Sequence, residues 1–162
     1  MSKLSKFYNH SGTDNHGRTL KDIWAWSDDD LESVHDYIQW LFPLKEKSRY
    51  NVRAPLLTDA DIGKIDKDSV RHSFLVMCDF YGIEYRGVTV SKHPMTWSHK
   101  SQNWFTPGNH NFLRLTRIIK SLMLFGLKSE ANTLELFLVD LYNRHATTIG
   151  EKTLEHWKAA IK

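Results

Sequence analysis

The chain has 162 residues, 41% of them hydrophobic, and a formal net charge of +3. This length is close to one domain and suffices to bury a core without a disulfide or a structural metal. The single cysteine cannot form an internal disulfide, and the N-terminus shows no apolar leader. No apolar run approaches the roughly 18 residues of a spanning helix. We therefore expect a soluble, cytoplasmic protein without membrane insertion.

Capping boxes predict the helices of the first half of the chain. Thr19 with Asp22 opens a short helix through "LKDIWAW". Ser27 with Asp30 opens one continuous helix through "DDDLESVHDYIQWLF", which Pro43 ends. An irregular connection follows, and Thr58 with a carboxylate three residues later opens a brief helical turn.

The second half contains four clearer segments. Val70, Phe74, Met77, Cys78 and Tyr81 form one apolar face of a helix that ends at a glycine, so Cys78 is expected to be a core residue. Residues 83–108 predict a long loop with a short hairpin at "EYRGVTV", and three helices follow over residues 109–125, 129–145 and 150–162. The predicted fold class is all-α: residues 1–162 as a single compact bundle of about six helices.

Polar groups interrupt the apolar stretch "HDYIQWLFPL". On a continuous helix, His35 and Gln39 border the apolar face one turn apart, while Asp36 and Trp40 lie on the opposite side. These groups are either the hydrogen-bonded border of a core helix or the polar part of a site, and the first is the more common arrangement.

A narrow arginine stripe marks the helix "HNFLRLTRIIKSL". Arg114 and Arg117 lie on one line of this helix between apolar neighbours, and a desolvated guanidinium needs an anion beside it. We expect that one of the two is partly buried and paired with an acid of the earlier helix, most directly Asp36. An anionic ligand is the other candidate partner.

Charge is distributed unevenly along the chain. Residues 1–84 hold 11 Lys/Arg and 14 Asp/Glu, residues 85–129 hold 7 Lys/Arg and no acid, and residues 130–162 hold 4 and 5. The acid-free segment either forms an anion-binding face or neutralises the acidic first half within the fold. As a nucleic-acid interface it would use Lys92, Lys100 and Trp104, with aromatic rings stacking on bases.

Motifs for metal binding, nucleotide binding or a catalytic nucleophile do not occur in the sequence. We therefore predict no catalytic residue, no metal and no cofactor. An enzyme that uses His35 as a base, with Asp36 or Arg117 nearby, is the least favoured of the alternatives.

Four segments together carry a family resemblance: "HDYIQWLFPL", "SRYNVRAPLLT", "MCDFYGI" and "HNFLRLTRIIKSL". In this order and spacing they resemble the conserved region of the opioid growth factor receptor family, over roughly residues 7–145. The resemblance implies an all-helical domain, binding of an opioid growth factor peptide, and membrane or nuclear association in animals. It supplies no catalytic residues, and we expect a stand-alone bacterial or fungal member.

The preferred interpretation is a non-enzymatic, opioid growth factor receptor-like binding module for a peptide or a small anionic ligand. Its expected site lies where the "HDYIQW" helix meets the arginine stripe, lined by His35, Gln39, Trp40, Arg114 and Arg117.

Overall fold

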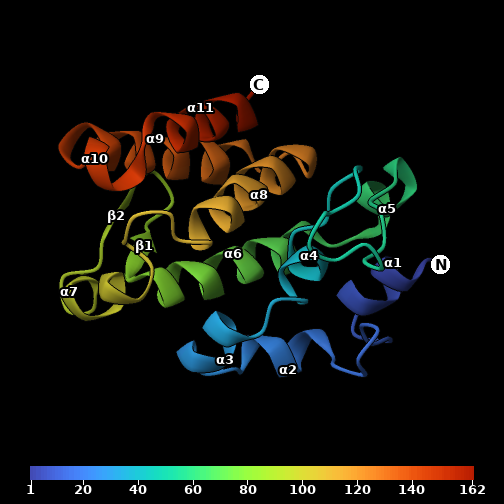
Figure 1. Cartoon of the computed structure of the whole chain (residues 1–162). Helices are drawn as coiled ribbons and strands as arrows, with labels where there is room; N and C mark the ends of the chain where they lie inside the picture. Colours follow the sequence, from blue (N-terminus) through green and yellow to red (C-terminus); the bar gives the residue numbers. More distant parts are fainter. The chain divides into compact units, whose positions relative to one another are not determined.

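The computed structural model describes all 162 residues, of which 58% are helical, in eleven α-helices and one small sheet (Figure 1). The chain divides into two compact units, Met1–Ser73 and Phe74–Lys162. The predicted helical character is therefore confirmed, but the fold is not strictly all-α because a pair of strands is present.

The first unit is built from short helices. They are α1 (Lys3–Tyr8), α2 (Leu20–Trp24), α3 (Asp28–Ser33), α4 (Ile38–Leu41), α5 (Asp59–Lys64) and the start of α6 (Lys67–Tyr81). The predicted capping boxes of Thr19 and Thr58 are both present, each hydroxyl accepting from the N–H of an aspartate whose carboxylate returns a bond to the cap. Local sequence thus sets where α2 and α5 begin.

The single helix predicted for residues 28–42 is wrong, because the chain breaks between α3 and α4. Val34 adopts an extended conformation, with φ −87° and ψ 129°. Two bonds satisfy carbonyls at the break: the Tyr37 hydroxyl donates to the Leu31 carbonyl at 2.7 Å, and Asn51 Nδ2 donates to the Asp36 carbonyl at 3.2 Å. Partners distant in sequence therefore replace the helical bonds at this point, and the helical-wheel positions of the residues after Val34 do not apply.

Aromatic side chains form the core of the first unit. The rings of Phe7 and Trp40 lie 5.3 Å apart, and both side chains are almost fully buried. The Tyr8 hydroxyl donates to the Leu41 carbonyl and lies 2.9 Å from the Ser73 hydroxyl, which accepts from the Trp24 indole N–H at 2.9 Å. Burial raises the pKa of the Tyr8 phenol, so this group stays protonated and bonded within the core.

The second unit combines a hairpin with longer helices. Its elements are the remainder of α6, β1 (Ile83–Tyr85), β2 (Val90–Lys92), α7 (Trp97–Lys100), a 3-10 turn η1 (Ser101–Asn103), α8 (Asn111–Leu124), α9 (Lys128–Arg144), α10 (Ala146–Ile149) and α11 (Glu151–Ala160). Helices α8, α9 and α11 pack against one another. The Trp157 indole N–H donates to the Phe112 carbonyl at 3.1 Å and ties α11 to the first turn of α8.

The predicted hairpin is confirmed, whereas the predicted long loop over residues 83–108 is wrong. Strands β1 and β2 are antiparallel with Glu84 opposite Ser91, and the segment continues into α7 and η1. Gly82 ends α6 with φ +74°, and a Cβ at this position would lie 3.1 Å from the Trp97 Cα. This close approach requires glycine and places α7 against the end of α6.

Cys78 is buried on α6, as predicted from the apolar face of that helix. Burial, together with the nearby Asp79, raises the pKa of its thiol. The thiol is therefore a core group rather than a nucleophile.

None of the helices combines the length and the apolar character that crossing a membrane requires.

A pair of glycine substitutions tests the packing of the first unit. A Cβ at Gly12 would lie 2.8 Å from the Lys6 Cβ, so Gly12→Ala should lower the free energy of unfolding by about 1–3 kcal/mol through overpacking. Gly63 lies within α5 facing open space, so Gly63→Ala should raise that free energy by about 0.5–1 kcal/mol. Urea denaturation of both variants measures this, and a neutral Gly12→Ala would contradict the close approach.

Candidate functional site

A buried carboxylate organises the loop that joins α1 to α2. Asp14 Oδ1 accepts from the backbone N–H groups of His16 and Arg18 at 2.9 and 3.0 Å. Its Oδ2 accepts from Arg18 Nε at 2.6 Å, and its side chain has no exposed surface. An aspartate that bonds the backbone two and four residues onward favours such a turn over a continued helix.

Arg18 connects this loop to the break between α3 and α4. Its Nη2 donates to Asp36 Oδ1 at 2.8 Å, and its guanidinium carbon lies 5.1 Å from the centre of the Trp26 ring. Burial by itself lowers the pKa of Arg18, but the hydrogen bonds to Asp36 and Asp14 outweigh it and raise that pKa. The guanidinium is thus a permanent cation held between two carboxylates.

The carboxylate of Asp36 has two partners within the first unit. Its second oxygen, Oδ2, lies 2.9 Å from His16 Nε2, so the carboxylate is held by Arg18 and His16. Neither of these two partners was predicted from the sequence. The four-residue spacing of Asp14 and Arg18 was a signal for their own pair, but no local pattern connects either residue to Asp36. The pairing of Arg114 or Arg117 with an acid of the earlier helix stays a prediction.

The three predicted site residues of the first unit differ in their exposure and contacts. His35 is exposed. Gln39 is 3% exposed, and its Oε1 accepts from Asn51 Nδ2 at 3.3 Å. Trp40 is 1% exposed and packs on Phe7. Gln39 and Trp40 therefore hold the fold of this unit, Gln39 through its bond with Asn51 and Trp40 through its packing on Phe7.

The two predicted arginines lie on α8 in the second unit. Arg114 is 6% exposed, which confirms that one arginine of the stripe is buried. Its Nη1 donates to Asn111 Oδ1 at 3.4 Å, and the same oxygen accepts from the Tyr81 hydroxyl at 3.2 Å. Arg117 is half-buried. Because the five predicted lining residues belong to two separately described units, their common site stays a prediction.

The residues predicted for a nucleic-acid interface are only partly accessible. Trp104 has no exposed surface, and its indole N–H donates to the Tyr81 carbonyl at 2.9 Å. Lys100 Nζ donates to the backbone carbonyl of Asp79 at 2.7 Å. Lys92 is exposed and lies 5.0 Å from the ring centre of Trp97, which is half-buried. Of the three residues predicted for this interface, Lys92 is exposed, Lys100 is half-buried and Trp104 is fully buried.

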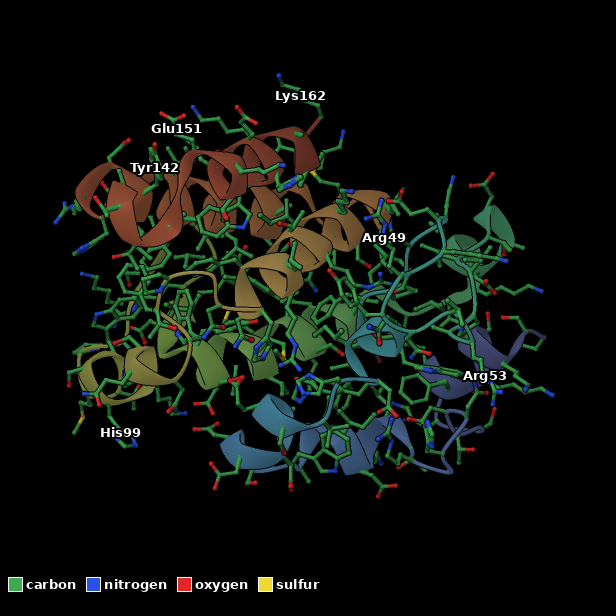
Figure 2. All side chains as sticks on the ribbon, viewed as in Figure 1. Arg49, Arg53, His99, Tyr142, Glu151 and Lys162 are labelled. Carbon is green, nitrogen blue, oxygen red and sulfur yellow. The ribbon has the colours of Figure 1, made fainter.

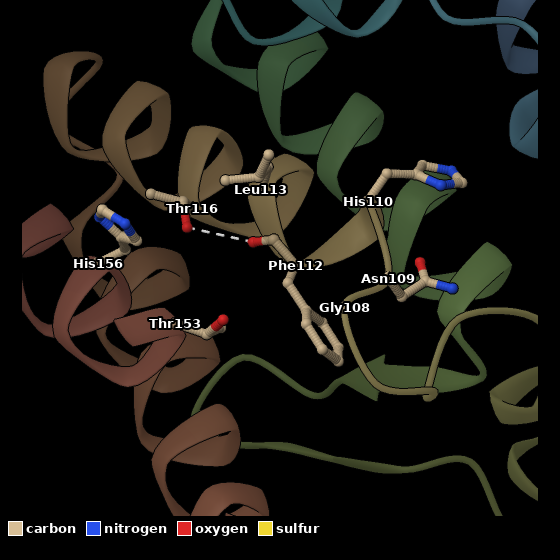
Figure 3. A pocket seen from close by; sticks show the side chains of 8 residues that line it. All are labelled: Gly108, Asn109, His110, Phe112, Leu113, Thr116, Thr153 and His156. Carbon is tan, nitrogen blue, oxygen red and sulfur yellow. Dashed lines mark hydrogen bonds between the residues drawn. The ribbon is translucent and has the colours of Figure 1, made fainter. Parts of the chain in front are cut away.

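A small recess of about 150 Å³ lies in the second unit between α8 and α11 (Figure 3). It is lined by Gly108, Asn109, His110, Phe112, Leu113, Thr116, Thr153 and His156. Figure 3 shows the two imidazoles on opposite sides of the recess, and the Thr116 hydroxyl already donates to the Phe112 carbonyl at 3.1 Å. No group of three or more His, Cys, Asp or Glu side chains is arranged to hold a metal ion.

A larger pocket of about 330 Å³ lies in the first unit beside α1. It is lined by Lys3, Lys6, Gly12, Thr13, Asp14 and Asn15. Lys3 and Lys6 are exposed, one turn apart on α1, and neither forms an ion pair. The backbone N–H groups of Gly12 and Thr13 have no acceptor within the chain. This pocket was not predicted from the sequence.

The end of α1 explains how the pocket forms. The Ser11 N–H donates to the Lys6 carbonyl at 3.0 Å and the His10 N–H to the Phe7 carbonyl at 3.3 Å, while His10 has φ +66°. This is the pair of bonds of a Schellman motif, which turns the chain back over the helix. Gly12 then passes close to Lys6, and the following loop faces the two lysines.

Another buried carboxylate fixes α1 from its opposite end. Asp61 Oδ1 accepts from the hydroxyls of Ser2 and Ser5 at 2.5 and 2.9 Å. Burial by itself raises the pKa of Asp61, but the hydrogen bonds from Ser2, Ser5 and Thr58 outweigh it and hold that pKa below its ordinary value of 3.8. The carboxylate is therefore ionised at neutral pH and keeps α1 against α5.

The chain is thus a mainly helical protein whose polar pairs fix its loops and whose pocket beside α1 presents donors. A family model described as the opioid growth factor receptor (OGFr) conserved region matches residues 1–162, and the chain belongs to this family.

Named relatives agree with this assignment. The chain is 33% identical over 147 residues to opioid growth factor receptor-like protein 1 of Rattus norvegicus, covering 86% of this chain and 31% of the relative. It is 31% identical over 160 residues to the opioid growth factor receptor of Homo sapiens, covering 91% and 23%. The chain therefore spans less than a third of the length of these relatives. No solved structure matches the chain.

A double-mutant cycle tests the Arg18 connection. Arg18→Gln and Asp36→Asn should show a coupling of about 1–2 kcal/mol in the free energy of unfolding, because the pair is charged but partly solvent-screened. The matched cycle of Lys45→Gln and Asp59→Asn, an exposed pair at 2.7 Å, should couple by at most about 0.5 kcal/mol. Equal coupling in the two cycles would contradict the organising role of Arg18.

The hydrogen bonds of Asp61 predict that the free energy of unfolding depends on pH. Because the folded-state pKa is depressed, the stabilisation is complete above the ordinary pKa and is lost as the pH falls through the lower folded value. Asp61→Asn should therefore destabilise the protein at pH 7, and its difference from the wild type should shrink below about pH 4. Urea denaturation across pH 3–7 measures this, with the exposed Asp59→Asn as control. A difference that is constant with pH would disprove the assignment.

Proposed function

We propose that the chain is a non-enzymatic binding module that takes an anionic ligand, the carboxylate end of a peptide or a small anion, in the pocket beside α1. The observation that carries this proposal is the set of donors at the pocket. Lys3 and Lys6 have no acid partner, and the N–H groups of Gly12 and Thr13 have no acceptor. Ammonium and backbone N–H groups together recognise carboxylate and phosphate.

Asp14 does not oppose an anion as strongly as its position in the lining suggests. Both of its oxygens already accept hydrogen bonds, and the Arg18 cation lies 2.6 Å from one of them. Its negative charge is thus compensated locally, while the charges of Lys3 and Lys6 are not. The electrostatic balance of the pocket therefore favours an anion over a cation.

The names of the relatives support a peptide as the ligand. The human and rat proteins are named receptors for opioid growth factor, and a peptide with a free C-terminus supplies one carboxylate. A binding role is supported further by the state of two groups that could act in catalysis. His16 is paired with Asp36, and the Cys78 thiol is buried with a raised pKa.

Calorimetric titration with an opioid growth factor peptide tests this function. The free-acid peptide should bind with a Kd in the micromolar range, and the same peptide with an amidated C-terminus about tenfold more weakly, since one charge-assisted contact is lost. Lys3→Gln/Lys6→Gln should weaken the binding of the free-acid peptide by about tenfold or more, and inorganic phosphate should compete with this peptide.

The control variant is Lys64→Gln/Lys67→Gln, which removes the same charge from exposed positions of the same unit outside the pocket. It should change the affinity by less than about twofold, because screened distant charges contribute little. Equal affinity for the acid and the amide, or an unchanged Kd in Lys3→Gln/Lys6→Gln, would refute the proposed pocket.

A further inference from the structure

The segment Ser48–Ala54 has no helix or strand, yet its backbone is fixed at several points. The Ser48 hydroxyl accepts from the N–H groups of Tyr50 and Asn51 at 3.1 and 3.2 Å. Asn51 Nδ2 donates to the Asp36 carbonyl, and its own carbonyl accepts from the Ala54 N–H at 3.2 Å. The loop is therefore ordered by its polar residues rather than by burial of apolar ones.

The side chains on either side of Asn51 face solvent. Tyr50 is 74% exposed and Val52 is 69% exposed, although both are large and hydrophobic. Arg49 and Arg53 are also exposed, and neither forms an ion pair (Figure 2). Folding thus fixes the backbone of this loop without giving these four side chains a partner. Arg49, Tyr50, Val52 and Arg53 are called the arginine–tyrosine surface below.

The charge around this surface differs from that of its unit. Residues 45–53 hold four Lys/Arg and one acid, whereas residues 1–73 as a whole hold eleven Lys/Arg and twelve Asp/Glu. Of the four cations, Lys45 is paired with Asp59. The uncompensated positive charge is therefore local, because the other residues of this unit hold seven Lys/Arg and eleven Asp/Glu.

We infer that the arginine–tyrosine surface docks a short, extended acidic segment of a partner polypeptide. Guanidinium groups bind carboxylates through paired hydrogen bonds, and the exposed Tyr50 ring packs against an apolar side chain of the partner. The chain from Arg49 to Arg53 spans at most about 14 Å, so about four extended residues cover it. This inference does not rest on the proposed function of the pocket beside α1.

A polypeptide fits this surface better than a nucleic acid. A continuous phosphate backbone extends its charge well beyond a patch of this length, and the rest of the unit, which holds more Asp/Glu than Lys/Arg, offers it no further attraction. A short acidic peptide places its charge only where the two arginines lie. The expected complex is small and transient, with an affinity in the range of about 10–100 µM.

The test uses the full chain and a fluorescently labelled heptapeptide, Glu-Asp-Glu-Phe-Glu-Asp-Glu, acetylated and amidated so that it has no terminal carboxylate. Fluorescence anisotropy should show binding that Arg49→Gln/Arg53→Gln weakens by about tenfold or more and that Tyr50→Ala weakens by about threefold to tenfold. Lys3→Gln/Lys6→Gln removes the same charge from the pocket and should change the Kd by less than about twofold.

A charge reversal provides an independent readout. Arg49→Glu/Arg53→Glu should lose the acidic peptide and gain binding of the corresponding lysine peptide, because the backbone bonds of Ser48 and Asn51 are untouched. Absence of acidic-peptide binding, an unchanged Kd in Arg49→Gln/Arg53→Gln, or tighter binding of a single-stranded oligonucleotide of equal charge would overturn the inference. Loss of the acidic peptide in Lys3→Gln/Lys6→Gln would also overturn it.

Discussion

The two hydrogen-bonded contacts of Arg18, one with buried Asp14 and one with Asp36, are the constraint on which the first unit depends. The guanidinium holds the loop after α1 through Asp14 and the break between α3 and α4 through Asp36. Asn51 bonds the carbonyl of the same Asp36 and thereby fixes the loop at residues 48–54. One arginine therefore connects, directly or through a single residue, the pocket and the exposed loop of this unit.

The physical reason for this arrangement is the cost of burying a carboxylate. A charged group removed from water must receive hydrogen bonds, a counter-charge or both, or the fold becomes unstable. Asp14 meets this requirement with backbone N–H groups and Arg18, while Asp61 meets it with hydroxyls from Ser2 and Ser5. Both solutions act on short irregular segments and on α1, which has only six residues and could not hold its position alone.

Some polar side chains of the first unit are engaged in its structure, whereas others are free to bind a ligand. The side chains of Asp36 and Gln39 are engaged within the unit, whereas Lys3, Lys6 and the arginines of the loop at residues 48–54 are exposed and unpaired. Rigid loops that present unpaired charge are common places for recognition. The first proposal for this member of the opioid growth factor receptor family uses the lysines of α1 with the loop that follows it, and the second uses the loop at residues 48–54. Neither needs a conformational change of the core.

The sequence by itself determined the features that depend on near neighbours: the capped starts of α2 and α5, the apolar face of α6, the hairpin, and the burial of Cys78. Each rests on residues within a few turns of one another, so periodicity and capping patterns suffice. The tertiary structure alone decided the break at Val34, the pairing of Asp36 with Arg18, and the pocket beside α1. These depend on groups many residues apart, whose meeting is set by the desolvation of charges and by aromatic packing, and no local pattern records that.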